Sequence, residues 1–315
     1  METYDSIIVG GGIAGLQAAI QLGRYEHKVL VIDSGNGRSV LCRSYHNVLG
    51  WPDGVSGEEL RRLGRQQAER LGVAFAADEV VQAVAVGQDV PQFELWGKTG
   101  KGYEASTLLL ATGLLDRCPD LPGLRACLGL TVYVCPDCDG YEIRDKSTLV
   151  LGSGDTGASM ALLLHERTRE LVYINHEQKA VKHELLAALK AKGIGYESGE
   201  IALVQTEGEG RFRGVTLAGG KRLMAERAFI AFGCNEVRSD LARQLGAERL
   251  ENRHIVTDPR SKMTSVPHVW AAGDVGVHAE QVTIAMGEGS QAAIWMHKAL
   301  VAQREARRLR QPVLP

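Results

Sequence analysis

The sequence has few cysteines, no long hydrophobic run and almost no excess of charge of either sign. Six cysteines among 315 residues are too few for a secreted scaffold held by disulfides. No apolar stretch approaches the roughly 18 residues of a membrane helix, and Glu2 and Asp5 stand where a signal peptide has basic residues. The 36 basic and 38 acidic side chains leave no positive excess for binding nucleic acid. We therefore expect a cytoplasmic protein that binds neither membranes nor nucleic acid.

Glycine is abundant, with 37 residues, and its first cluster follows a short β-branched run. Residues 6–9 predict a strand, and Gly10, Gly12 and Gly15 precede a helical pattern. This G-x-G-x-x-G spacing suits a tight turn, the approach of a pyrophosphate to the backbone, and close packing of helix on strand. A second predicted strand ends in Asp33, 18 residues after Gly15, where an acid can accept hydrogen bonds from ribose hydroxyls. An ordinary glycine-rich turn is the alternative, but the strands and the acid in register favour a dinucleotide site.

The chain repeats this pattern once. Gly152, Gly154 and Gly157 again stand between a predicted strand and a predicted helix. From Gly10 to Asp33 is 23 positions, and from Gly152 to Asn175 is also 23, so the terminal acid has become an amide. The repeat predicts a second dinucleotide-type domain with an altered site.

Cys135 and Cys138 are separated by two residues, the spacing at which two thiols close a small disulfide ring and exchange with another disulfide. Half of a zinc site is the alternative interpretation, but it needs a second close pair of ligands. The other cysteines are isolated in sequence, so we expect a redox dithiol and no metal site. Asp139 follows the pair directly and could donate the proton that a leaving thiolate needs.

Five motifs stand in the order and spacing of the low-molecular-weight thioredoxin reductases, and this resemblance covers nearly the whole chain. They are the two glycine loops, Ala-Thr-Gly at 111–113, Cys-Pro-Asp-Cys-Asp-Gly at 135–140 and Ala-Gly-Asp at 272–274. The resemblance implies an α/β fold with two dinucleotide-binding, Rossmann-like three-layer domains, the second inserted into the first. Residues 1–114 plus 242–315 would form the FAD-binding domain, and residues 115–241 the inserted domain that carries the redox disulfide.

The same resemblance assigns roles to single residues. It implies that Cys138 faces the flavin, that Cys135 attacks the external substrate and that Asp139 is the acid. The implied FAD ligands are Gly10, Gly12, Gly15, Asp33, Asn47, Gly113, Gly273, Asp274 and Gln281. The second dinucleotide would lie on Gly152, Gly154, Gly157 and Asn175.

The chain departs from this family where NADPH would be selected. The family has His-Arg-Arg where residues 175–177 read Asn-His-Glu, a further Arg near Val181, and Arg-Gln-Ala where residues 280–282 read Glu-Gln-Val. Arginines pair with the 2′-phosphate of NADPH, whereas Glu177 would repel it. We therefore expect NADH or a second FAD at the second loop, and NADPH less.

A second departure lies at residues 42–47, which read Cys-Arg-Ser-Tyr-His-Asn. This stretch resembles atypical relatives, including fungal dithiol oxidases that pass electrons to oxygen and flavoprotein disulfide reductases that do not use pyridine nucleotides. Within it, His46 is a candidate proton carrier beside the flavin; a structural loop histidine is the alternative. Residues 298–310 hold five basic side chains, which are either a solvated helix end or a docking patch for an acidic partner such as a ferredoxin.

These residues leave three functions open. The first is a homodimeric FAD enzyme that exchanges electrons between flavin and a disulfide through Cys135 and Cys138. Its substrate would be a thioredoxin-like protein or a small dithiol or disulfide, and its donor or acceptor would be NADH, a second flavin, ferredoxin or oxygen. The second is an ordinary NADPH-dependent thioredoxin reductase, and the third is a flavin-binding redox sensor without turnover. The direction of electron flow is not encoded in these motifs.

Overall fold

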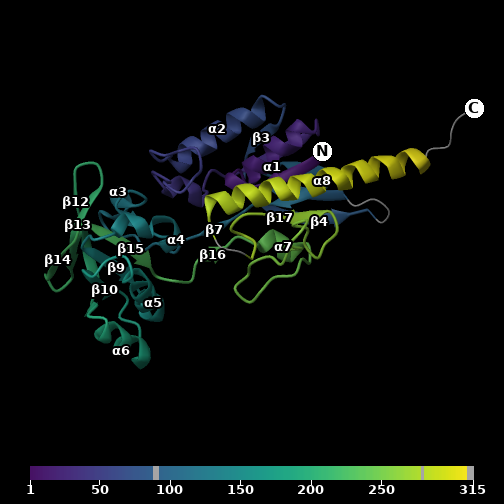
Figure 1. The fold of residues 1–315 in the computed structure, drawn as a ribbon. Helices are drawn as coiled ribbons and strands as arrows, with labels where there is room; N and C mark the ends of the chain where they lie inside the picture. Colours follow the sequence, from purple (N-terminus) through teal and green to yellow (C-terminus); the bar gives the residue numbers. More distant parts are fainter. Residues whose placement is uncertain (88–91, 278–279, 311–315) are drawn as a thin grey trace, which may run out of the picture. The chain divides into compact units, whose positions relative to one another are not determined.

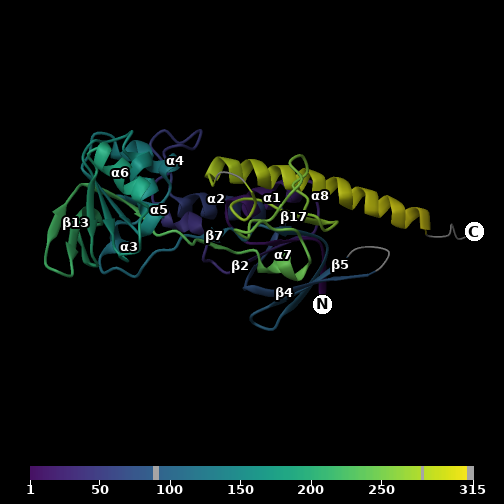
Figure 2. The ribbon, with the colours of Figure 1, turned by 90° about the horizontal axis from the view of Figure 1, so that it is seen from below.

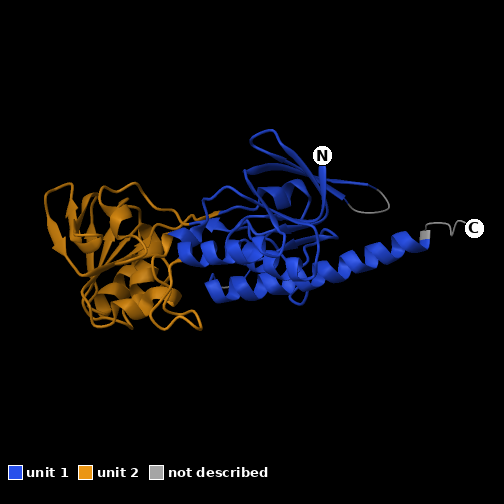
Figure 3. Ribbon diagram, turned by 90° about the horizontal axis from the view of Figure 1, so that it is seen from above, with its two compact units in different colours: residues 1–40, 57–115, 237–315 blue, residues 41–56, 116–236 orange. Residues whose placement is uncertain are grey.

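The computed structural model describes residues 1–87, 92–277 and 280–310, and the chain divides into two compact units (Figure 3). Unit 1 comprises residues 1–40, 57–115 and 237–315, and unit 2 comprises residues 41–56 and 116–236. The chain thus leaves unit 1, forms most of unit 2 and returns, as the inserted-domain plan expects. Segment 41–56 groups with unit 2, whereas the sequence had placed it in the FAD-binding domain.

Unit 1 is built on a parallel sheet that is extended by an antiparallel hairpin (Figures 1 and 2). The strand order is β3-β2-β1-β6-β5-β4, and β17 also pairs with β6. The carboxyl ends of the parallel strands meet at one edge, where nucleotides bind in sheets of this kind. The strands are β1 (Glu2–Val9), β2 (Val29–Asp33), β3 (Ala74–Ala77), β4 (Val80–Val86), β5 (Gln92–Gly97), β6 (Gly102–Leu110) and β17 (Val269–Ala271).

Both faces of this sheet are buried, which explains why its central strands are nearly continuous apolar runs. Ile7 and Val9 point into one core cluster and Ile8 into the other, because successive side chains alternate across a strand. The helices α1 and α8 run side by side over the Ile8 face (Figure 1), and the β4–β5 hairpin and α7 cover the opposite face. The helices are α1 (Ile13–Arg24), α2 (Gly57–Glu69), α7 (Asp240–Gln244) and α8 (Val282–Arg310).

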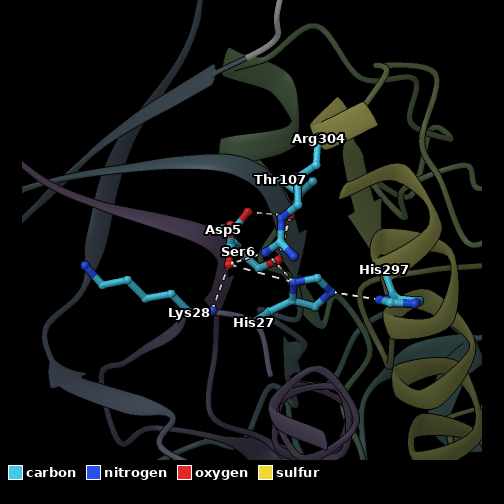
Figure 4. Close-up of polar contacts among 7 residues, drawn as sticks. All are labelled: Asp5, Ser6, His27, Lys28, Thr107, His297 and Arg304. Carbon is cyan, nitrogen blue, oxygen red and sulfur yellow. Dashed lines mark hydrogen bonds and ion pairs between the residues drawn. The ribbon is translucent and has the colours of Figure 1, made fainter. Parts of the chain in front are cut away.

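A polar cluster fixes the C-terminal half of α8 against the start of the sheet (Figure 4). Arg304 donates to Asp5 Oδ2 at 3.0 Å, and the backbone N–H of Lys28 donates to the same oxygen at 2.9 Å. His27 Nε2 lies 2.9 Å from His297 Nδ1, and Arg304 lies 3.2 Å from His27 Nδ1. Arg304, one of the five basic residues of the proposed docking patch, is therefore engaged inside unit 1.

Unit 2 repeats the same plan on a smaller scale. Its parallel sheet has the order β11-β10-β9-β15-β8, and a separate antiparallel sheet has the order β12-β13-β14. The helices α5 and α6 cover one face, and the antiparallel sheet with α3 covers the other. The elements are α3 (Leu124–Cys127), β8 (Val132–Tyr133), α4 (Pro136–Asp139), η2 (Gly140–Ile143), β9 (Thr148–Gly152), α5 (Gly154–Leu164), β10 (Leu171–Asn175), α6 (His183–Ala191), β11 (Gly195–Ser198), β12 (Ile201–Glu207), β13 (Arg211–Leu217), β14 (Arg222–Met224) and β15 (Arg227–Ala231).

Three short elements remain, and all three lie where the chain passes between the units. Strand β7 (Leu114–Leu115) pairs with β16 (Glu236–Val237), and the 3-10 helix η1 (Arg38–Leu41) precedes segment 41–56. Among the described residues, no helix is long and apolar enough to cross a membrane. Strand β17 ends at Ala271, and Gly273 takes a left-handed φ of 78°.

Candidate active site

The first glycine loop of unit 1 has the geometry of a pyrophosphate cradle. Gly10 has φ 108°, and a Cβ at Gly10 or Gly15 would collide with a backbone carbonyl, of Ala111 and Gly10 respectively. At Gly12, the N-cap of α1, a Cβ would meet no atom within 4 Å. Glycine is thus required at two positions by packing and leaves open space at the third. A helix N-terminus presents N–H groups that suit a phosphate, and Gly12 leaves space for one at this end of α1.

Asp33 ends β2 beside this loop, as the sequence predicts. Its Cγ lies 2.9 Å from where a Cβ of Gly11 would stand, so the carboxylate flanks the cradle. Arg61 of α2, which sequence reasoning missed, pairs with Asp33 Oδ2 at 2.5 Å. The acid is placed to accept from a ribose, and Arg61 would share it with the hydroxyls.

The turn after β17 brings the predicted Gly273 and Asp274 to the same sheet edge. The Gly273 N–H donates to Glu288 Oε2 at 3.0 Å, and Lys262 pairs with Glu288 Oε1 at 2.9 Å. Glu288 is only 8% exposed, so this bond fixes the turn from inside the protein. The predicted Gln281 stands just before α8, where its carbonyl accepts from the N–H of Ala285.

Arg38 links Asp274 to Glu280 and explains one departure from the family. Its Nη1 lies 3.2 Å from Asp274 Oδ2 and 2.6 Å from Glu280 Oε2. The anion found at residue 280 is therefore matched by a cation from another part of unit 1. The reversed charge at residue 280 was a sequence signal that a cation would pair with Glu280, but it did not identify Arg38 as that cation.

Two predicted FAD ligands lie in different units. Gly113 follows β6 in unit 1 with φ 65°, and its carbonyl accepts from the N–H of Arg238 at 3.0 Å. Asn47 lies in segment 41–56, which groups with unit 2. The structure brings the other seven predicted FAD ligands to unit 1 together with Gly113, but not Asn47.

In unit 2, Cys135 and Cys138 form a disulfide at the start of α4, with a Cα–Cα distance of 5.3 Å. Cys135 is the N-cap and accepts from the Cys138 N–H at 3.1 Å, and Pro136 occupies the first helical position. The Asp139 N–H donates to the Cys135 carbonyl at 3.0 Å, so the predicted acid belongs to the same turn. Among the described residues, no group of three His, Cys, Asp or Glu side chains could hold a metal.

In the second glycine loop, Asn175 takes the position that Asp33 has in the first, and its hydrogen bonds differ from those of Asp33. Asn175 Oδ1 accepts from the Gly154 N–H at 3.1 Å, and its Nδ2 donates to the Lys179 carbonyl at 2.7 Å and to Tyr196 Oη at 3.1 Å. Asn175 is 1% exposed. The side-chain amide of Asn175 therefore connects the loop to Lys179 and Tyr196 by hydrogen bonds. A Cβ at Gly157 would collide with the Tyr173 ring, so the loop retains the close helix–strand packing.

Glu177 stands beside this loop with two cations. It pairs with Arg117 and, at 2.8 Å, with Lys179. The Arg117 guanidinium, then Lys179 and Ser153, lower the pKa of Glu177 to about 2. The carboxylate is thus charged at neutral pH and holds the two cations that could otherwise meet a phosphate. Sequence reasoning missed Arg117, which lies 60 positions before Glu177 in the chain.

Comparison with known proteins agrees with this geometry. Residues 4–289 match the family described as pyridine nucleotide-disulphide oxidoreductase, and the chain belongs to that family. It is 32% identical over 304 residues to the thioredoxin reductase of Treponema pallidum, which covers 93% of this chain and 96% of that protein.

Solved structures place the chain in the same group. The crystal structure of HlmI has a TM-score of 0.87 and 32% identity, covering 97% of this chain and 95% of that one. A putative thioredoxin reductase from Bacillus anthracis has a TM-score of 0.82 and 25% identity, covering 96% and 99%. The protein is therefore an FAD-dependent disulfide oxidoreductase of thioredoxin-reductase type. The predicted α/β fold with two Rossmann-like domains is confirmed.

Proposed function

We propose that the protein exchanges electrons between FAD and an external disulfide or dithiol through Cys135 and Cys138, with a donor or acceptor other than NADPH. The observation that carries this proposal is the contrast within unit 2. The redox disulfide is complete on α4, whereas Glu177 holds the cations near the second glycine loop.

The residues of unit 1 fit FAD. The open space at Gly12 suits its pyrophosphate, and Asp33 would accept from its ribose. Asp274, held by Arg38 and by the Gly273 turn, would contact the ribityl chain, as the family resemblance implies. Bound FAD supplies two-electron chemistry that the side chains themselves lack.

Cys135, Cys138 and Asp139 carry out the exchange with the external sulfur. Cys135 exchanges with the external sulfur, because by the resemblance Cys138 is the thiol that faces the flavin. When the Cys135–Cys138 bond opens, one sulfur leaves as a thiolate and needs a proton, and the resemblance assigns this proton to Asp139. The helix N-terminus at Cys135 favours the thiolate form, while the charges of Asp137 and Asp139 oppose it.

The second loop supports NADH or a second flavin better than NADPH. An incoming 2′-phosphate would meet a carboxylate that already occupies Arg117 and Lys179. NADH has no such phosphate and loses nothing from this arrangement. Reduced ferredoxin or oxygen as the other reactant needs no nucleotide at this loop at all.

A thioredoxin-like protein is one candidate substrate, because the curated relatives bear the name thioredoxin reductase. A small dithiol is the other, because segment 41–56 resembles that of atypical relatives. A cytoplasmic homodimer is part of the same proposal and rests on the family resemblance and on the sparse cysteines. The ordinary NADPH-dependent reductase is the alternative that those relatives' names favour.

The test is an anaerobic titration of the purified protein with NADH, NADPH, reduced ferredoxin and dithiothreitol in turn, following the visible absorbance of the flavin. We expect dithiothreitol to reduce the flavin and NADH to be at least as effective as NADPH. Efficient reduction by NADPH alone would show the ordinary reductase, and no response to any dithiol would contradict the exchange itself.

A further inference from the structure

Residues 44 and 46 form, with Glu142, a hydrogen-bonded histidine site in unit 2. His46 Nδ1 lies 3.2 Å from Glu142 Oε1, and its Nε2 lies 3.0 Å from Ser44 Oγ. A carboxylate only accepts hydrogen bonds, so Glu142 favours the tautomer in which Nδ1 carries the proton and Nε2 keeps its lone pair. The Ser44 hydroxyl then donates to Nε2. The carboxylate orients the imidazole and leaves a basic nitrogen on its other side, as an orienting acid does in catalytic triads.

The loop around this histidine is built to hold it. Tyr45 and Val55 exchange two backbone hydrogen bonds of 2.7 and 3.1 Å. Gly54 has φ 82°, and a Cβ there would stand 2.6 Å from His46 Cδ2 and would collide with the Ser44 hydroxyl. The side chain of His46 is nevertheless 47% exposed, so a substrate in solution can reach the ring.

The same loop runs along the segment that carries the redox disulfide. Glu142 lies on η2, four positions after Cys138 and directly beyond α4. Cys42 lies two positions before Ser44 in the same loop. Burial, as the larger cause, and the nearby carboxylate of Asp139 raise the pKa of the Cys42 thiol to about 12. Two separate interactions, Cys42 with Asp139 and His46 with Glu142, therefore place this loop beside residues 135–142.

We propose that His46 is the general acid and base for the external thiol that exchanges with the Cys135–Cys138 disulfide, and that Glu142 is its positioning residue. This inference rests on the exchange proposed above. The external S–H takes the place of the Ser44 hydroxyl as donor to Nε2. Asp139 serves the protein's own thiolate, so each sulfur that changes its charge has a proton carrier.

His46 Nε2 takes the proton of the external thiol while that sulfur attacks Sγ of Cys135. A mixed disulfide forms, the Cys135–Cys138 bond breaks, and its electron pair stays on Cys138 as a thiolate. In the reverse direction the imidazolium returns the proton to the departing external thiolate. No further oxidant or reductant enters this step.

The test follows the disulfide itself. Oxidised full-length protein is mixed anaerobically with dithiothreitol, quenched with N-ethylmaleimide, and the labelling of Cys135 and Cys138 is read by peptide mass. The series extends from below to well above the ordinary histidine pKa of about 6.5. His46→Asn should slow opening of the disulfide by about 100-fold near neutral pH, because general base catalysis contributes a factor of this order.

The pH profile separates catalysis from a structural role. Wild type should show an ionisation in the histidine range, whereas His46→Asn should follow only the thiolate fraction of the reagent. Glu142→Gln should also slow opening of the disulfide, since the imidazole loses the carboxylate that orients it, and Glu142→Asp should restore part of the rate. His183→Asn, an exposed histidine of α6, is the matched control and should match wild type.

Failure of the His46 role gives a different result from failure of the disulfide exchange itself. If wild type opens its disulfide and His46→Asn does so with an unchanged rate or an unchanged pH profile, the role of His46 is wrong while the exchange stands. A wild-type disulfide that does not react with dithiothreitol overturns the proposed function together with this inference. If His46→Asn does not fold, the rates of Glu142→Gln and Glu142→Asp decide in the same way: rates equal to that of wild type in both variants would overturn the role of the His46–Glu142 pair.

Discussion

The two glycine loops share their spacing, but their terminal residues have opposite roles. In unit 1, Asp33 flanks an open cradle and pairs with the guanidinium of Arg61. In unit 2, Asn175 is buried and bonds to the Gly154 N–H and to a backbone carbonyl. A ribose could compete for the first residue but would have to displace structural hydrogen bonds at the second. The two loops therefore share their close packing, while the hydrogen bonds of their terminal residues differ.

The largest expected effect concerns the disulfide, which only unit 2 carries. Cys135→Ser and Cys138→Ser should each lower turnover of a dithiol or disulfide substrate by on the order of 10³-fold or more, because the exchange needs both sulfurs. Steady-state assays with dithiothreitol or a thioredoxin measure this loss. Cys118→Ser, at an exposed cysteine outside the disulfide, is the control and should keep its activity.

Substitutions in the first loop should separate packing from binding. Gly12→Ala meets no atom within 4 Å, so we expect a folded protein whose FAD affinity falls by about 10- to 100-fold as the methyl group enters the pyrophosphate space. Flavin fluorescence of the reconstituted protein measures the affinity.

Gly15→Ala is the matched comparison. Its Cβ collides with the Gly10 carbonyl, so we expect poor folding in addition to loss of FAD. Normal FAD affinity in Gly12→Ala would contradict the placement of the pyrophosphate at this loop.

Removal of the Glu177 carboxylate should allow the second loop to bind the 2′-phosphate of NADPH. Glu177→Gln releases Arg117 and Lys179, and charge-assisted hydrogen bonds to a phosphate contribute about 1.5–3 kcal/mol. NADPH affinity should therefore rise by roughly 10- to 100-fold while NADH affinity changes little. Isothermal titration calorimetry with both nucleotides measures the difference. Glu184→Gln on α6 serves as the control, and an equal gain for both nucleotides would refute the role given to Glu177.

The smallest effect concerns stability in acid and is specific to unit 1. Burial, then His27 and Arg304, lower the pKa of His297. Tyr25 stacks on its ring at 4.0 Å, and Asp5 is the carboxylate of the cluster. The folded state thus resists protonation of His297, so its stabilising contribution is complete above pH of about 6.5 and is lost as the pH falls below that value.

Thermal unfolding at mildly alkaline and mildly acidic pH tests this sign. His297→Gln keeps an acceptor for His27 but does not titrate, so its Tm should fall less on acidification than that of wild type. The difference should be a few degrees, since 1 kcal/mol shifts Tm by about 2–4 °C in domains of 150 to 250 residues. His183→Gln should follow wild type, and an identical pH dependence in His297→Gln would rule out this contribution.

What the sequence could predict was local, and what it missed was long-range. The turn at Gly10, the N-cap at Cys135 and the residue that ends β10, Asn175, follow from spacing along a few neighbouring residues. Arg38, Arg61 and Arg117 could not be chosen this way. Each meets its carboxylate only after distant segments have packed, and a sequence with many charged residues offers many possible partners.

Segment 41–56 shows the same limit. Its motif indicated a departure from the family, but its grouping with unit 2 depends on contacts such as the bond from the Arg43 N–H to the Gly129 carbonyl at 3.0 Å. Glu280 was interpreted as a lost cation, and the structure shows that Arg38 supplies one from another element. The sequence therefore showed where the chain departs from the family pattern. Which cation neutralises a new carboxylate depends on how distant segments pack.

The central claim is that Cys138 exchanges electrons with the flavin and that Cys135 exchanges with the sulfur of the external substrate. Its most direct test is the visible spectrum of the two single-cysteine variants, Cys135→Ser and Cys138→Ser, purified with FAD and titrated toward alkaline pH. We predict that only Cys135→Ser develops a long-wavelength absorbance from a Cys138 thiolate beside the flavin. The same spectrum in both variants, or the band in Cys138→Ser alone, would contradict the account.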